Sequence, residues 1–495
     1  MLELEIRNRT AKIAVIGLGR VGYPLASLFA KKGFPTTGYD INKKRLKDIK
    51  QGTVQKELSS LFPHDRIERV RTIEEISKNL LISNNEQVLK KAKIFVVTVP
   101  TPLKINQTPN LTFLENACRI ISKFLQKGSL VIIESTIYPG ATETVIKPIL
   151  EKSALNAGRD FHLCFSPERI DPGNTKWRME KIPKIVGGID SSSLEAGCLF
   201  FSQIFEEIVP VSSLKIAEAA KMLENLFRSV NIALVNELSK VFEEMEIDIW
   251  ETIEAANTKP FGFLPHYPGP GVGGHCIPKD PFYLLYAARK MGINIKFVEE
   301  AANINRNMPF HILRLSELVL RRKNKRVIDS SFAVLGVTYK KDVPDARQTP
   351  AELIITELIK YSNEVMVFDP ICSETYGAKK GNMEKTIKDK DCIILMVDHS
   401  YFKNNHLEQK INELSPYSCI IDTRNFIDSK KLKKSIVYRC LGKPFKKKQD
   451  KTNLTTFNRS IYSDFNDNPF LSTQVYKPMR ANQKRKRLGK YESKF

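Results

Sequence analysis

The chain has 495 residues, of which 42% are hydrophobic, and it carries a formal net charge of +23. This length predicts two to four domains, and no apolar run reaches the roughly 18 residues that a membrane-spanning helix needs. The first residues, MLELEIRNRT, contain no apolar segment of the signal-peptide type. We therefore expect a cytoplasmic globular protein that does not insert into a membrane.

The basic character of the chain is concentrated at its C-terminal end. From Leu441 onward there are 14 Lys or Arg against 4 Asp or Glu, so this tail supplies +10 of the +23. A polar tail without apolar periodicity is typical of a disordered segment. The remaining charge is dispersed, so nucleic acid is not expected as a partner. The eight cysteines form no CxxC pair, and neither a disulfide framework nor a metal site is indicated.

Residues 1–205 alternate between strands and helices. AKIAVIGLG reads as a strand, VGYPLASLFAKKG as a helix and TTGYD as a second strand. Further buried strands are predicted in KIFVVTVPTP, SLVIIEST, FHLCFSPER and PKIVGG. This alternation predicts a parallel, doubly wound α/β sheet, a Rossmann-like domain.

Residues 206–325 are predicted to form a central helical domain. From Ser212 or Ser213, a plausible N-cap, about 30 residues run without Pro or Gly and with apolar residues at helical spacing. A helix of this length suits a spine between domains or a dimer interface. A Gly/Pro-rich segment follows, and then a helical stretch to about Met308.

Residues 326–440 repeat the strand and helix alternation, in SFAVLGVTYK, TPAELIITELIK, EVMVFDP, DCIILMVDHS and SCIIDTRN. The chain is therefore predicted to hold two Rossmann-like doubly wound domains, joined by the helical domain and followed by the tail at 441–495. The first domain is expected to bind a dinucleotide.

A dinucleotide fingerprint lies at the first strand–helix junction, where Gly17-Leu18-Gly19-Arg20-Val21-Gly22 fits GxGxxG. Glycines at these places allow a tight turn and close approach of a pyrophosphate to the helix N-terminus. Asp40 ends the next strand, where an acid accepts hydrogen bonds from a ribose 2′-hydroxyl. An acid here favours NAD over NADP, because it would repel a 2′-phosphate.

Cys276 lies in the segment FLPHYPGPGVGGHCIPKDPFYL, with a helix predicted to begin near Pro278 or Pro281. A thiol just before a helix start is expected to have a stabilised thiolate. The glycines would let a substrate reach the sulfur, and the prolines would fix the loop. We interpret Cys276 as a nucleophile, against the alternative of an unreactive cysteine in a structural loop.

Three further positions complete a possible oxidation chemistry. Lys221 and Asn225 are four residues apart and share one helix face, although a lysine there can also be an ordinary surface residue. Glu168 and Arg169 follow a buried strand at the edge where such sheets bind ligands, and a surface ion pair is the alternative. These groups together fit a four-electron oxidation. NAD would remove a hydride from an alcohol, and the Cys276 thiol would capture the resulting aldehyde. Lys221 would stabilise the negative oxygen, and Glu168 would act as the base for water.

Taken together, these motifs resemble the UDP-glucose/GDP-mannose dehydrogenase family over about residues 11–440. The motifs that carry the resemblance are IAVIGLGRVGYPLA, VPTP, EST, SPER, AEAAKMLEN, GPGVGGHCIPKD and VTYKKDVPDARQTP. The resemblance implies a homodimer or higher homo-oligomer formed through the long central helix.

The resemblance also implies the roles of the site residues. The catalytic candidates are Cys276, Lys221, Glu168, Asn225 and Asp280. Besides the fingerprint and Asp40, the cofactor-binding candidates are Arg45, Thr101, Thr136, Lys279 and Arg347. Besides Glu168, Lys221 and Asn225, the substrate-binding candidates are Arg169, Tyr267, Gly271, Gly273, Tyr339, Lys340 and Arg424.

Within this family, TKPFGFLPHYPGPGVGGHCIP and SPERIDPGN are most similar to enzymes that oxidise UDP-N-acetylglucosamine at C6 to the uronate, for surface polysaccharide precursors. Lys279 is more similar to UDP-glucose enzymes, and UDP-glucose and UDP-N-acetylmannosamine stay as alternative substrates. Two rivals remain. One is a two-electron dehydrogenase of the hydroxyacid type, and the other is a non-catalytic, nucleic-acid-associated protein recruited by its tail.

Overall fold

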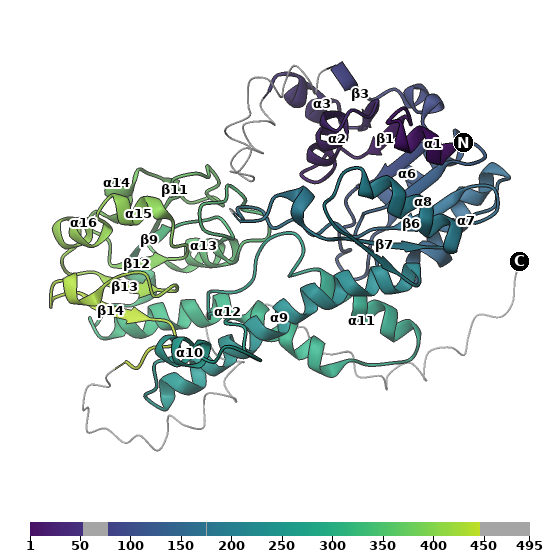
Figure 1. Ribbon diagram of the computed structural model, residues 1–495. Helices are drawn as coiled ribbons and strands as arrows, with labels where there is room; N and C mark the ends of the chain where they lie inside the picture. The colour runs from purple at the N-terminus through teal and green to yellow at the C-terminus, as the bar shows by residue number, and fades with distance from the viewer. Residues whose placement is uncertain (53–77, 175, 446–495) are drawn as a thin grey trace, which may run out of the picture.

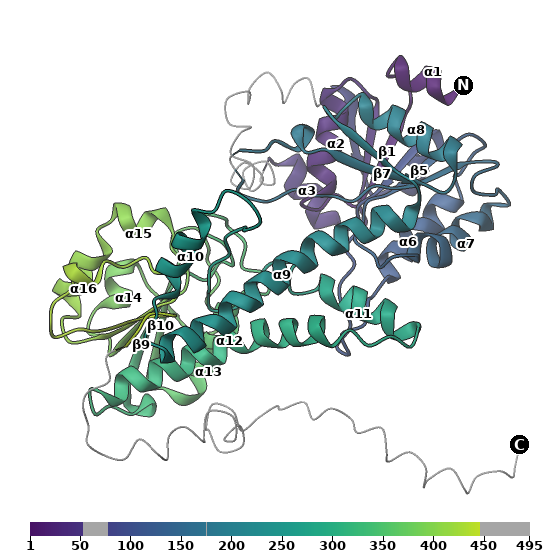
Figure 2. The ribbon, with the colours of Figure 1, turned by 60° about the horizontal axis from the view of Figure 1, so that its bottom comes forward.

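The computed structural model describes residues 1–52, 78–174 and 176–445, so nearly all of the predicted tail lies outside the described residues. Two sheet-containing regions lie at opposite ends of a pair of long helices (Figure 1). Turning the molecule shows the same arrangement, with the long helices passing from one region to the other (Figure 2). The predicted fold class is confirmed.

The N-terminal region is built on an eight-stranded sheet with the order β3-β2-β1-β4-β5-β6-β7-β8. Its strands are β1 Ile13–Ile16, β2 Thr36–Tyr39, β3 Leu80–Ser83, β4 Ile94–Val97, β5 Leu130–Ile133, β6 His162–Phe165, β7 Lys184–Gly188 and β8 Ile208–Val211. Its helices are α1 Leu2–Arg7, α2 Gly22–Lys31, α3 Lys43–Lys50, α6 Thr112–Ser122, α7 Lys147–Leu150 and α8 Ser191–Ser202. Short helical segments are η2 Glu86–Lys91, η3 Thr142–Ile146, η4 Glu151–Ser153 and η5 Met179–Lys181.

Alternate residues of β1 enter different hydrophobic cores. Ile13 and Val15 pack in one buried cluster, and Ala14 and Ile16 pack in the other. Because successive side chains of a strand point to opposite faces, each face of the sheet has its own core. This is the doubly wound arrangement that the apolar strand sequences predict.

Two strands, β7 and β8, run opposite to the other strands of the expected parallel sheet. β7 pairs with β6 in the antiparallel direction, while β8 pairs with β7 in parallel. The described residues of the segment 166–183 contain no full crossover helix between β6 and β7, and the chain returns in the opposite direction. Glu168 and Arg169 lie in this connection, at the carboxyl end of β6.

The central helices are α9 Leu214–Glu244, α10 Ile249–Asn257, α11 Asp280–Lys290 and α12 Lys296–Arg321. The long helix is confirmed: α9 has 31 residues, and the Ser213 side chain caps it by accepting from the N–H of Ile216. The predicted end of the last helix near Met308 is wrong. α12 continues through Pro309, because its following turns bury an apolar face that includes Ile312 against the C-terminal region. That burial outweighs the loss of one helical hydrogen bond.

The C-terminal region holds a six-stranded parallel sheet with the order β11-β10-β9-β12-β13-β14. Its strands are β9 Ser331–Leu335, β10 Glu364–Phe368, β11 Lys379–Lys380, β12 Cys392–Leu395, β13 Cys419–Asp422 and β14 Val437–Cys440. The helices beside it are α13 Pro350–Tyr361, α14 Met383–Ile387, α15 Ser400–Asn404 and α16 Leu407–Leu414, with short turns η6 Val327–Asp329 and η7 Ser429–Lys431. Phe332 and Ala333 of β9 enter separate cores on its two faces.

A loop that follows β9 reaches across to the N-terminal region. Val343 in this loop is 1% exposed and belongs to the hydrophobic cluster beneath β1 and α2. Gly173 lies against it: a Cβ at this glycine would be 2.5 Å from Val343 Cγ2. The two sheet regions are therefore packed together through this loop as well as through the helices.

Candidate active site

The glycine-rich turn between β1 and α2 has the geometry that close backbone packing requires. Gly17 has a φ of +94°, in the region that favours glycine. A Cβ at Gly22 would lie 1.9 Å from the Gly17 carbonyl oxygen, so no larger residue fits there. A Cβ at Gly19, by contrast, would meet nothing within 4 Å. The turn thus leaves open backbone at the start of α2, which fits a dinucleotide pyrophosphate.

Asp40 and Arg45 brace this turn from the second βα unit. One carboxylate oxygen of Asp40 accepts a hydrogen bond from Leu18 N at 2.7 Å, and the Nε of Arg45 donates to Leu18 O at 2.9 Å. Asp40 lies directly after β2, where the sequence places a ribose-binding acid. Its contact with the turn holds the carboxylate at the edge where the cofactor is predicted to bind.

The loop that carries Cys276 is fixed from several sides. The Cys276 carbonyl accepts from the N–H groups of Lys279 at 3.0 Å and Asp280 at 2.8 Å, which begin α11. Gly274 donates to the Arg347 carbonyl at 2.9 Å. Gly273 lies so close to Tyr339 that a Cβ would be 2.6 Å from the Cβ of that tyrosine. The loop can therefore pack against the C-terminal region only with glycine at this position.

Three of the predicted catalytic side chains and the backbone of a fourth residue, Glu168, converge on this loop. Lys221, in α9, donates to the Glu168 backbone carbonyl. One turn further along the same helix, Asn225 Nδ2 donates to Asp280 Oδ2 at 2.5 Å. Asp280 is 1% exposed and Lys221 is 7% exposed. The structure thus joins α9, α11 and the segment after β6 around Cys276.

The charges of this cluster act on the Cys276 thiol. Burial raises its pKa, and the nearby Asp280 raises it further, whereas Lys221 and Lys279 act in the opposite direction. The expectation of a stabilised thiolate before a helix start is wrong for the protein without ligands, because the effect of burial exceeds that of the helix and the lysines. Burial alone would lower the pKa of Lys221, but Glu168 and Cys276 outweigh it and the pKa is raised, so this lysine is charged.

A raised thiol pKa predicts the pH dependence of alkylation. Below the pKa, the thiolate fraction rises about tenfold per pH unit. Because the pKa of Cys276 is above its ordinary value, inactivation by iodoacetamide should rise by about tenfold per unit from about pH 6.5 to about 8.5. A rate that levels off below about pH 8 would contradict the raised pKa. Initial inactivation rates in the absence of NAD and sugar measure it.

Lys279, predicted to bind the cofactor, is buried beneath the loop. Its Nζ donates to the Thr101 carbonyl at 2.9 Å, and Tyr283 OH donates to the same oxygen at 2.5 Å. Thr101 Oγ1 in turn donates to the Thr136 carbonyl at 2.8 Å. These contacts tie the start of α11 to the two threonine segments that follow β4 and β5. Lys279 reaches the predicted cofactor edge through Thr101, and its contact with NAD stays a prediction.

The candidates from the C-terminal region lie around the same loop. A Cβ at Gly269 would be 2.8 Å from a terminal nitrogen of Arg424, so this guanidinium lies beside the PGPG segment. Lys340 instead forms an ion pair with Asp171 at 2.7 Å and donates to the Pro172 carbonyl at 2.9 Å. Lys340 therefore contacts the segment after β6, three and four residues beyond Glu168.

Three candidates have contacts that point elsewhere. Tyr267 stacks on Trp250 with ring centroids 5.7 Å apart, and its hydroxyl donates to Glu254 at 2.7 Å. Arg169 pairs with Glu224 at 2.5 Å and donates to the Pro183 carbonyl at 2.8 Å. Gly271, with a φ of +125°, lies against the backbone of α12. Their roles in substrate binding stay predictions.

Sequence reasoning missed residues that hold the site together. The buried Asp345 forms ion pairs with Arg20 of the glycine-rich turn and with Arg347, at 2.7 Å for the latter. Buried Asn236 accepts from the N–H of Gly269 at 2.9 Å and donates to Asn305 at 2.9 Å. Asp345 is the first residue of the motif DARQTP, beside the predicted cofactor ligand Arg347. Its place in that motif was the signal that could have identified it. The two asparagines had none, because only the packing of α9 on α12 brings them together.

Comparison with known proteins agrees with this architecture. Family models of the UDP-glucose/GDP-mannose dehydrogenase family match in three parts: the NAD binding domain over residues 11–209, the central domain over 215–307 and the UDP binding domain over 333–429. The chain belongs to this family. It is accordingly an NAD-dependent oxidoreductase, as the sequence predicts, and its third part corresponds to a UDP-binding domain.

Individual relatives cover most of the chain. It is 39% identical to a UDP-N-acetyl-D-glucosamine 6-dehydrogenase of Pseudomonas aeruginosa over 79% of this chain and 92% of that protein. It is 33% identical to a UDP-N-acetyl-D-mannosamine dehydrogenase of Pyrococcus horikoshii, over 87% and 99%. The solved structure of the UDP-D-ManNAc dehydrogenase from P. horikoshii has a TM-score of 0.79 at 33% identity, covering 87% of this chain and 99% of that one. Among the described residues, no helix is long and apolar enough to cross a membrane.

Proposed function

We propose that this chain oxidises the C6 hydroxyl of a UDP-sugar to the carboxylate, through a thiohemiacetal and a thioester on Cys276. The observation that carries the proposal is the convergence of Lys221, Asn225, Asp280 and the Glu168 segment on the loop of that cysteine. A simple two-electron dehydrogenase needs no thiol beside its charged groups. A four-electron oxidation needs one to hold the aldehyde.

NAD supplies the acceptor for each of the two hydrides when it is bound. The Cys276 thiol, protonated at rest, adds through sulfur to the aldehyde carbon. Its proton ends on the former carbonyl oxygen, which the charged Lys221 stabilises while that oxygen is negative. After the second hydride has left, a water attacks the thioester, Glu168 accepts the water proton and the C–S bond breaks. Asn225 holds Asp280 beside this lysine. The product is the uronate, with the thiol restored.

The preferred substrate we propose is UDP-N-acetylglucosamine, with UDP-N-acetylmannosamine as the second candidate. The relative named for the first sugar has 39% identity, and the relative named for the second has 33% identity over a larger share of the chain. Both of these sugars carry a 2-acetamido group, and the similarity to their enzymes favours them over UDP-glucose. The products fit the synthesis of surface polysaccharide precursors.

A panel of UDP-sugars tests this function. NADH is measured against UDP-N-acetylglucosamine, UDP-N-acetylmannosamine and UDP-glucose, and the uronate is quantified by chromatography. We expect two NADH per uronate and the highest kcat/KM with UDP-N-acetylglucosamine. One NADH per product would favour the two-electron rival, and no turnover with any of them would favour the non-catalytic one. A truncation after Gly442 with unchanged activity would show that the tail is peripheral.

We also propose that the protein is a homodimer through α9. Large apolar side chains are exposed along one stripe of this helix, including Leu223 at 67%, Phe227 at 50% and Leu234 at 51%. Their spacing of four and seven residues is that of a helix–helix seam. Leu223→Glu with Leu234→Glu should convert the dimer to a monomer, measured by light scattering. Leu4→Glu, at another exposed leucine, is the control, and an unchanged mass for the double variant would refute this interface.

The cytoplasm is the compartment we propose, because the reaction needs NAD and a UDP-sugar. The eight free cysteines are compatible with a reducing compartment.

A further inference from the structure

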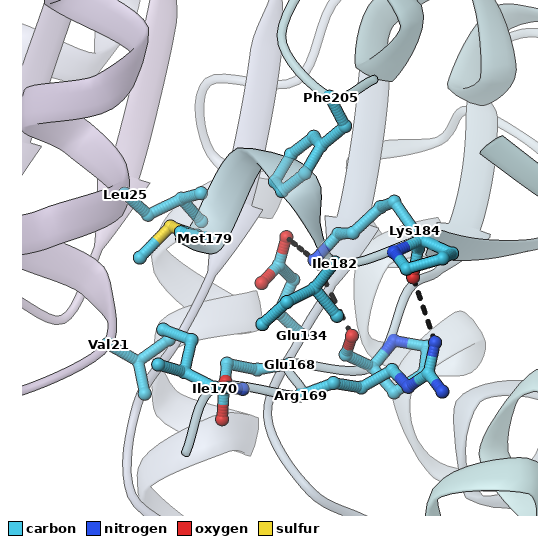
Figure 3. Close-up of a pocket in the computed structure, with 12 residues that line it drawn as sticks. Val21, Leu25, Glu134, Glu168, Arg169, Ile170, Met179, Ile182, Lys184 and Phe205 are labelled. Carbon is cyan, nitrogen blue, oxygen red and sulfur yellow. Dashed lines mark hydrogen bonds and ion pairs between the residues drawn. The ribbon is translucent and has the colours of Figure 1, made fainter. Parts of the chain in front are cut away.

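A charged pair is buried at the carboxyl edge of the N-terminal sheet, beside the predicted catalytic segment (Figure 3). Glu134 directly follows β5 and Lys184 begins β7. Their side chains are 1% and 7% exposed, and Lys184 Nζ lies 2.9 Å from Glu134 Oε1. The ammonium also lies over the rings of Phe201 and Phe205, at 5.0 and 5.2 Å from their centroids. Removing two charges from water this completely lowers the stability of the fold unless their mutual attraction compensates for the lost hydration. This cost is a reason to look for a functional role.

The second oxygen of Glu134 has no hydrogen-bond partner among the described residues, and it is buried. Figure 3 shows it pointing away from Lys184, toward the side of the pocket where Val21 and Met179 lie. The space open to water in this pocket is about 20 Å³, which is sufficient for one water molecule. The oxygen itself has almost no surface that a water molecule can reach, so Lys184 is the group that compensates the charge of this carboxylate. Burial raises the pKa of Glu134, and Lys184 opposes this effect.

The pair contacts the segment that carries Glu168. Lys184 Nζ lies 3.5 Å from the Pro167 carbonyl oxygen, and Lys221 Nζ donates to the next carbonyl, that of Glu168. Two successive carbonyls are thus each faced by a lysine ammonium. Glu168 itself lines the same pocket as Glu134. The backbone position of the proposed base therefore depends on both lysines, and Glu134 holds one of them in place.

We propose that Glu134 and Lys184 are positioning residues for the hydrolytic step. The pair orients Glu168, which accepts the proton of the attacking water when the C–S bond breaks. Neither member of the pair exchanges a proton with the substrate. This inference rests on the thioester route proposed above. It assigns the pair to hydrolysis and leaves the two hydride transfers independent of it.

Rapid mixing with NAD and the most active sugar of the panel separates the steps. In Glu134→Gln, two NADH per active site should form at the wild-type rate. Steady-state turnover should then fall by about 10- to 100-fold, the order that misplacement of a catalytic group costs. Acid-quenched protein should carry the thioester on Cys276, detected by mass spectrometry. Lys184→Met should give the same split, and Glu134→Asp, which keeps the charge, should recover much of the turnover.

The matched control is Glu243→Gln. It removes the same charge from another buried ion pair, Arg439–Glu243, whose side chains are 10% and 8% exposed. This control should leave both phases unchanged. Equal slowing of the burst and the steady state in Glu134→Gln would overturn the proposal, and so would normal turnover with only a lowered melting temperature. If the wild type itself releases one NADH per sugar, the thioester route is refuted, and the role of the pair in hydrolysis with it. The wild-type stoichiometry distinguishes this outcome from a failure seen only in the variants.

Discussion

Replacing Cys276 with serine should lower steady-state NADH production from the UDP-sugar by at least about 10³-fold, the order lost when a covalent nucleophile is removed. The serine hydroxyl has the shape of the thiol but is a far weaker nucleophile at neutral pH, so the aldehyde would not be carried on to the thioester. The loop geometry should persist, because the Cys276 contacts to Lys279 and Asp280 use its backbone carbonyl. Binding of NAD and UDP-sugar, measured by calorimetry, should therefore be retained.

Cys198→Ser is the matched control for this variant. Cys198 is also a free, partly buried cysteine, but it lies in α8, on the helical layer of the N-terminal region. Its replacement should leave turnover within about twofold. Full two-step turnover in Cys276→Ser would overturn the thioester route, whereas loss of binding would show that the variant had disturbed the loop rather than the chemistry.

Replacing Lys221 with methionine should lower kcat by about 10²- to 10³-fold, the range lost when one group that stabilises an oxyanion is removed. Methionine keeps much of the length of the side chain and removes its charge. The raised pKa of Lys221 means that this charge is present throughout the neutral range. The loss should appear in kcat more than in KM, because the negative oxygen forms only in the transition state.

The same variant has a second readout at the thiol. Lys221 acts to lower the pKa of Cys276, so Lys221→Met should slow iodoacetamide inactivation at every pH below the thiol pKa. Lys215→Met is the control on the same helix, since Lys215 pairs with Glu143 near the surface. A change in kcat below threefold for Lys221→Met would remove this residue from the chemistry.

Much of the fold follows from local patterns in the sequence. The all-buried runs of β1 and β4, the glycine-rich turn and the uninterrupted 31 residues of α9 each specify their own element. The exceptions depend on distant packing. Pro309 lies inside α12 because an apolar face after it is buried, and β7 reverses because its connection to β6 is irregular. Neither property is readable from a window of a few residues.

The candidate site was partly predictable for the same reason. Cys276 stands in a motif dense in glycine and proline, which singles it out. Lys221 and Asn225 share one helix face, but that spacing also suits an ordinary surface lysine, and only the family resemblance indicates their role. The pKa of the thiol was not predictable, because it depends on how deeply the loop is buried and on which charges reach it. Asp345 and Glu134 escaped notice because their importance lies in partners that are distant in sequence.

The loop that carries Val343 across to the N-terminal region limits how the enzyme can exchange its ligands. Swinging the two nucleotide-binding halves apart would pull this side chain out of its apolar socket, at a cost of about 1.5–3 kcal/mol. It would also separate Asp345 from Arg20 and Lys340 from Asp171. These contacts hold the two halves near one separation before either ligand arrives, so little binding energy is consumed in bringing the NAD-binding and UDP-binding domains together.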